Sequence, residues 1–116
     1  MKDNVVKDKS LEFAVRIVNL YKFLVNEQKE FVMSKQILRS GTSIGAHIRE
    51  AEQAQSRADF INKLNIALKE ANETEYWLEL LIRTEYITRE QYESINNDST
   101  EINKLLISII KTTKNN

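Results

Sequence analysis

Both glycines of this 116-residue chain lie within five positions of each other, at Gly41 and Gly45, and the chain has no proline. The surrounding segment, residues 39–51, otherwise reads as one uninterrupted helix. Glycine inside a helix costs about 1 kcal/mol relative to alanine, so two of them close together indicate a compensating role. The missing Cβ atoms predict that a second backbone comes very near, and therefore that two helices pack tightly there.

The composition favours a single all-helical domain over residues 1–116. Without proline, the chain lacks the turn residues that a protein of short strands needs. Seventeen basic residues balance seventeen acidic ones, so no global field attracts nucleic acid or an anionic membrane. The absence of cysteine excludes disulfides and thiolate chemistry and indicates a reducing cytoplasm. No apolar run reaches the roughly 18 residues of a membrane span.

Apolar spacing predicts four helices, at about residues 10–26, 30–55, 56–84 and from 88 onward. The last two begin at caps, since Ser56 precedes Asp59 by three residues and Thr88 likewise precedes Gln91. The polar run 96–100 allows a kink, but the spacing continues across it and favours one helix. About eight N-terminal and about five C-terminal residues should fray. Four segments with short connections predict an antiparallel up-down-up-down four-helix bundle.

Heptad spacing identifies the residues that should form the core. Gly41 is expected to be one of them. We call the row of residues at heptad spacing on each helix its seam. The seams comprise Ile37, Gly41, Ile44, Ile48 and Ala51 in the second helix; Phe60, Leu64, Ala67, Ala71, Thr74, Leu78 and Leu81 in the third; and Tyr92, Ile95, Ser99, Ile102, Leu106 and Ile109 in the fourth.

The first helix is apolar around more of its circumference than one-sided packing requires. One stripe comprises Phe13, Ile17, Leu20 and Leu24, and the other comprises Ala14, Val18, Tyr21 and Val25. With Leu11 they span an arc of about 180°, against the ~100° that a single core face needs. Two interpretations remain open: the helix lies deep in its own bundle, or its extra arc meets another subunit.

No group of side chains points to a reaction. His47 and Glu50 share a helix face, but the chain has no second histidine to complete a di-iron site. Ser43 stands four residues before His47, yet nothing supplies an oxyanion hole. The segment 41–45 lacks the Gly-Lys-Ser/Thr ending of a phosphate loop. The sequence therefore predicts no catalytic residue, no metal, no cofactor and no small-molecule substrate.

A polar flank runs beside the apolar seam of the second helix. On the third helix, Glu75 stands where apolar neighbours would bury it, and a stranded carboxylate costs several kcal/mol. We therefore expect Arg39 to pair with Glu75 in an inter-helix network near Ser43 and Glu50 that sets the helix register. The flank comprises Gln36, Arg39, Ser40, Ser43, His47 and Glu50.

Two surface features have a plain interpretation and a functional one. Trp77 is most simply an aromatic residue at the bundle edge, but interfaces favour tryptophan, so a role in assembly is the alternative. Lys22, Lys29 and Lys35, with Arg39, suggest a basic patch near the first turn, which an ordinary solvated face also explains. If nucleic acid binds, Lys22, Lys29, Lys35 and Arg49 are the expected contacts.

Residues 36–51 resemble the four-helix-bundle family called 23S ribosomal RNA intervening-sequence proteins. The resemblance rests on an Arg-x-x-x-Ser-Ile-x-x-x-Ile-x-Glu core that begins at Arg39, and it continues through Asp59-Phe60, residues 66–71 and Glu75. Departures are His47 where the family usually has Asn, Arg49 where it has Ala, and Ala51 where Gly is frequent.

The resemblance implies a ring-shaped homopentamer with no established enzymatic activity, in which Arg39, Ser43 and Glu50 are structural or interface residues. A related group, the accessory variability determinant of diversity-generating retroelements, works with reverse transcriptase and nucleic acid through strongly basic surfaces. The neutral charge of this chain argues against that activity. We therefore expect a cytoplasmic, non-enzymatic oligomeric scaffold or accessory protein for an unidentified partner. The alternative is a nucleic-acid-binding accessory module that acts with a ribonucleoprotein or reverse transcriptase.

Overall fold

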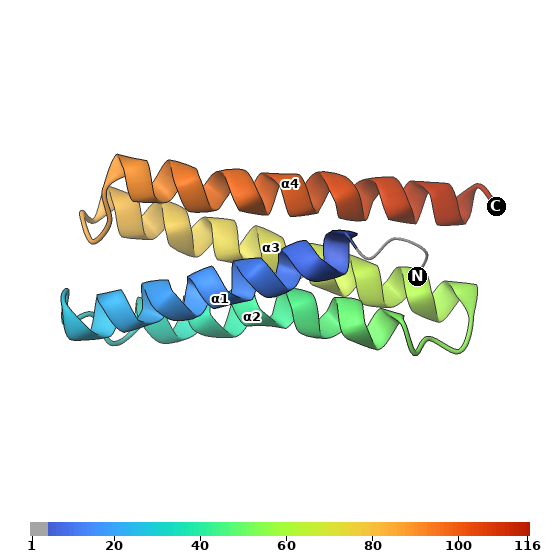
Figure 1. Ribbon diagram of the computed structural model, residues 1–116, viewed down its shortest axis with the longest axis horizontal. Coiled ribbons are helices and arrows are strands. Elements are labelled where there is room, and N and C mark those ends of the chain that lie inside the picture. Colours follow the sequence, from blue (N-terminus) through green and yellow to red (C-terminus); the bar gives the residue numbers. More distant parts are fainter. Residues whose placement is uncertain (1–4) are drawn as a thin grey trace.

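The computed structural model describes residues 5–116 as four α-helices (Figure 1). They are α1 (Val5–Asn26), α2 (Met33–Ala51), α3 (Arg57–Arg83) and α4 (Arg89–Lys114). Successive helices run antiparallel, and the α1–α2 and α3–α4 turns lie at the same end of a body 47 Å long (Figure 1). Both α1 and α3 pack against α2 and α4. This arrangement confirms the predicted all-α, up-down-up-down bundle.

The predicted seams form the core, with small shifts of register. All four residues of the first stripe of α1, from Phe13 to Leu24, are buried. Two predicted seam positions in α3 and α4, Phe60 and Tyr92, are only half-buried, and Ile110 replaces Ile109 as the buried residue of the last turn. In α2 the buried residues include Ile37, Gly41, Ile44, Ile48 and Ala51, as expected.

The predicted caps of α3 and α4 are present. Ser56 Oγ accepts a hydrogen bond from the Asp59 N–H at 3.0 Å. Thr88 and Gln91 exchange side-chain and backbone hydrogen bonds in a complete capping box. The helix α4 continues without a break through residues 96–100, so the alternative of a kink there is wrong.

Helix α2 is shorter than predicted at both ends. It begins at Met33 instead of Glu30, because the Glu30 carboxylate folds back on the helix N-terminus. That carboxylate accepts hydrogen bonds from three backbone N–H groups, those of Val32 (3.1 Å), Met33 (3.0 Å) and Ser34 (2.7 Å). The C-terminal end lies at Ala51, followed by a turn, and not at Gln55.

Within the described residues, the helices extend into the end segments where fraying is expected. Helix α1 already begins at Val5, and Val6 is fully buried, so apolar contact orders the segment 5–8. Helix α4 runs to Lys114 and has Lys111 and Lys114 in its last turn, where cations interact favourably with the helix dipole. Residues 1–4 lie outside the described part of the chain. Between residues 5 and 116, no helix is long and apolar enough to span a bilayer.

Both glycines face α1. A Cβ atom on Gly41 would stand 2.8 Å from both Cγ1 and Cγ2 of Ile17, so the Ile17 side chain fills the space of the missing methyl group. A Cβ atom on Gly45 would meet Ser10, with Oγ at 3.3 Å and the backbone carbonyl oxygen at 3.5 Å. The predicted approach of a second backbone is therefore found at Gly45, whereas at Gly41 a side chain makes the contact.

Candidate interface on the first three helices

Arg39 ties the outer edge of α2 to α3. Its Nη2 atom lies 2.5 Å from Glu73 Oε2, and its Nη1 atom lies 3.2 Å from Glu70 Oε2. The indole Nε1 of Trp77 donates a second hydrogen bond to Glu73 Oε2, at 3.0 Å. The ring of Tyr76 meets the Trp77 ring edge-on at a centroid distance of 5.1 Å. These five residues form what we call the Arg39 cluster.

The Arg39 cluster is held in its charged state. Hydrogen bonds from Arg39 and then from Trp77 lower the pKa of the Glu73 carboxyl below its ordinary value. In return, the hydrogen bonds to Glu73 and Glu70 raise the pKa of Arg39. Because the side chains are 49% and 36% exposed for Arg39 and Glu73, water screens the pair and its contribution to stability is modest.

The predicted pairing of Arg39 with Glu75 is wrong. Glu75 lies on the side of α3 that faces α4, where its Oε2 atom accepts hydrogen bonds from Ser99 Oγ (2.9 Å) and Asn103 Nδ2 (2.6 Å). Successive residues of a helix are rotated by about 100°, so Glu73 and Glu75 point to different neighbours. The carboxylate does find polar partners, as expected, but on the other adjacent helix.

The remaining residues of the polar flank do not converge on Arg39. Ser43 Oγ donates to the Arg39 carbonyl oxygen at 2.6 Å within α2, and Glu50 pairs with Lys63 on α3 at 3.2 Å. His47 Nδ1 is buried without a hydrogen-bond partner and lies 3.8 Å from Glu50 Oε1. Gln36 is exposed. Within residues 5–116, no group of three or more His, Asp or Glu side chains is arranged to hold a metal ion.

A buried hydroxyl pair that the sequence reading missed links α2 to α3. Thr74 Oγ1 donates to Ser40 Oγ at 2.9 Å, and both residues are fully buried. Each hydroxyl also lies near a carbonyl oxygen of its own helix, Thr74 Oγ1 at 2.8 Å from that of Glu70 and Ser40 Oγ at 3.5 Å from that of Ile37. The sequence did carry a signal, because Thr74 stands at a seam position where an aliphatic residue is usual.

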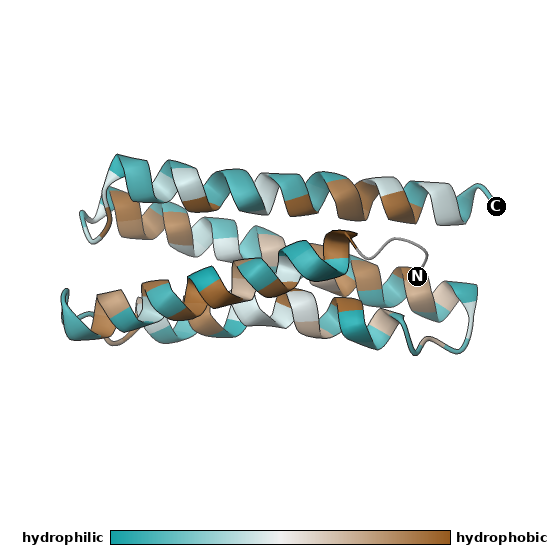
Figure 2. Cartoon of the chain, viewed as in Figure 1, coloured by the Kyte–Doolittle hydropathy of each residue, from teal (hydrophilic) through white to brown (hydrophobic). Residues whose placement is uncertain are grey.

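The outer side of α1 carries apolar side chains that the bundle leaves uncovered. Leu11 is 51% exposed and Val15 is 55% exposed. In Figure 2, hydrophobic bands recur along the whole of α1. We call the uncovered side the α1 stripe; it comprises Leu11 and Val15 with the half-buried residues Ala14, Val18, Tyr21 and Val25. The interpretation that α1 is buried deep in its own bundle is therefore wrong for this side.

Comparison with known proteins decides the family. The sequence matches the family model of the 23S rRNA-intervening sequence protein over residues 2–108. The chain belongs to the 23S rRNA-intervening sequence protein family. Among curated proteins, none matches it.

A solved structure supports the same assignment for this member of the 23S rRNA-intervening sequence family. It is the 1.70 Å crystal structure of a protein of unknown function from the S23 ribosomal protein family of Bacteroides thetaiotaomicron VPI-5482. The two chains are 99% identical and superpose with a TM-score of 0.94, over 96% of this chain and 99% of that one. The resemblance found in residues 36–51 is confirmed at the level of the family.

In this 23S rRNA-intervening sequence protein, the four predicted nucleic-acid contacts do not form one surface. Lys22, Lys29 and Lys35 are exposed near the α1–α2 turn, which also carries the exposed Glu27. Arg49 lies about 21 Å further along α2 from Lys35, at about 1.5 Å per residue. A single patch of these four residues is not formed.

Proposed function

We propose that this protein is a non-enzymatic oligomeric scaffold or accessory protein of the cytoplasm, and that copies of it assemble through the α1 stripe. The observation that carries the proposal is the exposure of Leu11 and Val15 in a continuous apolar surface. Contiguous exposed apolar patches on a folded protein mark interaction sites. We further propose a homopentamer, the assembly that the family resemblance implies.

Packing inside the bundle supports this use of α1. Its inner side is fixed to α2 at the two glycines, and its other edge is fixed to α4 by polar contacts. Arg16 Nη1 lies 2.6 Å from Asp98 Oδ2, and Arg16 Nη2 donates to Ser94 Oγ at 2.8 Å. The α1 stripe is thus presented on a helix that cannot turn it inward, and only another molecule can cover it.

The groove between α1 and α4 supports a scaffold better than an enzyme. The groove between α1 and α4 has a volume of about 280 Å³, and two of its polar lining residues are already engaged, Arg16 by Asp98 and Ser94 and Gln91 by Thr88. Binding sites for small molecules usually combine a concave apolar pocket with convergent polar groups that are free to bind. No catalytic role is therefore proposed for any residue.

Light scattering on size-exclusion fractions tests the assembly. We expect the wild type to have a mass five times that of the 13.6-kDa chain. Replacing Leu11→Glu together with Val15→Lys makes the stripe polar, while the new Glu–Lys pair at four-residue spacing supports the helix. This variant should elute as the monomer and keep its helical circular dichroism.

The control is Ile107→Glu on α4. Ile107 is 51% exposed, like Leu11, and the new glutamate would stand four residues before Lys111, which reproduces the same helical pair. It should leave the mass unchanged. A monomeric wild type, or dissociation by Ile107→Glu but not by the α1 substitutions, would contradict the proposal.

A further inference from the structure

The overall neutral charge conceals a strongly basic surface on α3 and α4. We call it the α3–α4 basic face; it comprises Arg57, Lys69, Lys104, Lys111 and Lys114, all exposed. None of the five takes part in an ion pair within residues 5–116. Lys63, which is closer to α2, is instead paired with Glu50.

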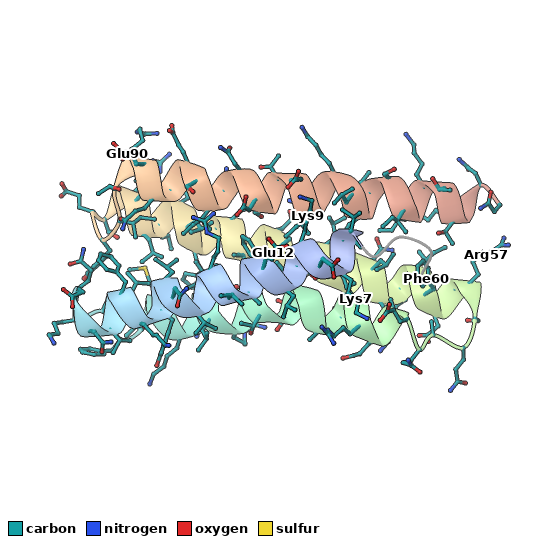
Figure 3. All side chains as sticks on the ribbon, in the orientation of Figure 1. Lys7, Lys9, Glu12, Arg57, Phe60 and Glu90 are labelled. Atoms are coloured by element: carbon teal, nitrogen blue, oxygen red, sulfur yellow. The ribbon has the colours of Figure 1, made fainter. Side chains whose placement is uncertain are left out.

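The register of the helices brings these cations together. Glu75 binds Ser99 and Asn103, and α3 and α4 run antiparallel, so the residues before Glu75 lie beside those after Asn103. On α4, the residues Lys104, Lys111 and Lys114 follow at spacings of seven and three, which keeps them on one side of the helix. Arg57 lies at the end of the bundle where α4 terminates (Figure 3).

Within residues 5–116, few acidic residues lie on the parts of α3 and α4 that carry these cations. Residues 102–116 contain no Asp or Glu. Between residues 57 and 72 the only acids are Asp59, which accepts a hydrogen bond from the Gln55 N–H, and Glu70, which pairs with Arg39. At the opposite end of the same helices, where Figure 3 labels Glu90, Glu79 and Glu93 are paired with their own arginines.

We propose that the α3–α4 basic face binds the phosphate backbone of a nucleic acid duplex. Its cations form two rows at about 1.5 Å per residue: Arg57 and Lys69 lie about 18 Å apart along α3 and about 120° apart round it, and the three lysines of α4 extend over about 15 Å. Packed helices lie about 8–10 Å apart, and the B-DNA major groove is about 12 Å wide, so the two rows can reach phosphates of both strands. The amides of Asn62, Asn65 and Asn72 add uncharged donors between the cations.

Other anionic partners fit this surface less well. A membrane surface would need a group of apolar side chains to insert, and on α3 and α4 only Tyr76 and Ile107 are exposed large apolar residues in the described part of the chain. A second copy of the chain could offer the acidic residues at the other end of its α3 and α4. Their ion pairs would first have to break, because Glu79 pairs with Arg83 and Glu93 with Arg89. This inference does not depend on the scaffold proposal, since its cations lie on α3 and α4 and none of them belongs to the α1 stripe.

Fluorescence anisotropy with 20-base-pair RNA and DNA duplexes of random sequence tests the proposal on the full chain. If all five cations of one chain contact phosphates, affinity should fall about 500-fold between 50 and 200 mM salt. The variant Lys104→Gln/Lys111→Gln/Lys114→Gln should bind more weakly at 50 mM salt. Its affinity should fall only about 10-fold between 50 and 200 mM salt. Glutamine is a good helix former, so folding should be unaffected.

The matched control is Lys22→Gln/Lys35→Gln/Arg49→Gln, which removes the same charge from three exposed cations elsewhere. It should bind duplexes like the wild type at each salt concentration. No binding at 50 mM salt, an equal loss in both triple variants, or binding to vesicles with anionic lipid or to polyglutamate but not to duplexes would overturn the proposal. Light scattering on the same samples, with the mass unchanged in both variants, separates this result from a change in assembly.

Discussion

At the scale of single residues, the two glycines of α2 have different roles although they lie one helical turn apart. Gly41 leaves room for the β-branched and therefore stiff side chain of Ile17, which has few ways to move aside. Gly45 faces Ser10 at distances close to ordinary van der Waals contact. Identical substitutions at the two sites should therefore have different effects.

We expect Gly41→Ala to destabilise the protein by about 1–2 kcal/mol, because overpacking costs more than the roughly 1 kcal/mol that alanine gains in helix propensity. Gly45→Ala should leave the unfolding free energy unchanged or raise it by up to about 0.5 kcal/mol, because the same gain in helix propensity is offset only by a mild contact with Ser10. Urea unfolding of both variants measures the difference. Equal destabilisation at the two sites would show that the Ile17 contact is not what requires glycine.

The Arg39 cluster predicts a dependence of stability on pH. Because folding lowers the pKa of Glu73, the ionised carboxylate stabilises the folded state fully at pH values above its pKa in the unfolded chain. This stabilisation is lost as the pH falls through its pKa in the folded protein. When the pH is lowered from about 5 to about 3, the unfolding free energy of the wild type should fall by about 0.5 kcal/mol more than that of Glu73→Gln. This is the size usual for an exposed pair. Glu79→Gln, which breaks only the pair within α3 with Arg83, serves as control in urea titrations at several pH values. An unchanged pH profile in Glu73→Gln would contradict this assignment.

At the scale of helices, much of the architecture could be predicted because it is encoded locally. Apolar residues at heptad spacing and the caps at Ser56 and Thr88 depend on neighbours in sequence, and the structure places them as expected. The partner of Arg39 could not be predicted, since Glu70, Glu73 and Glu75 all flank the seam of α3. Only the packed bundle determines that the first two face α2 and the third faces α4.

The helix ends were harder to predict for a similar reason. Lys29 and Glu85 adopt the left-handed conformation after α1 and α3, with φ of 55° and 67°, although glycine is the usual residue there. Glu30, a good helix former, reads as the first residue of a helix but acts as its cap from outside. The free cations of the α3–α4 basic face also escaped prediction, because balanced charge in the sequence does not tell which acids are already paired.

The Glu30 cap should be among the larger contributors to the stability of α2. Glu30→Ala removes a buried carboxylate that satisfies three backbone N–H groups, and we expect a loss of about 1–2 kcal/mol. Glu27→Ala, at an exposed position in the same turn, should change the unfolding free energy by less than about 0.5 kcal/mol. Urea denaturation together with amide exchange of residues 32–34 checks both. Unaltered exchange in Glu30→Ala would mean that the carboxylate is not the cap.

At the scale of the whole molecule, the bundle presents two unlike surfaces on different helices, one on α1 and the other on α3 and α4. The α1 stripe is apolar and suited to another copy of the chain, whereas the α3–α4 basic face is charged and suited to a polyanion. Assembly through α1 would leave α3 accessible, because α3 does not pack against α1. An oligomer of this kind would carry several copies of the basic face, and their binding would reinforce one another.

Thiol labelling at Val15 tests most directly whether another molecule covers the α1 stripe. The chain has no cysteine, so Val15→Cys and Ile107→Cys each introduce a single thiol, at positions that are 55% and 51% exposed in the isolated chain. If the stripe is the assembly surface, labelling of Val15→Cys should slow at least about tenfold as the protein concentration rises through the assembly range, while Ile107→Cys reacts at a constant rate. Equal and constant rates at the two positions, at every concentration, would contradict the account.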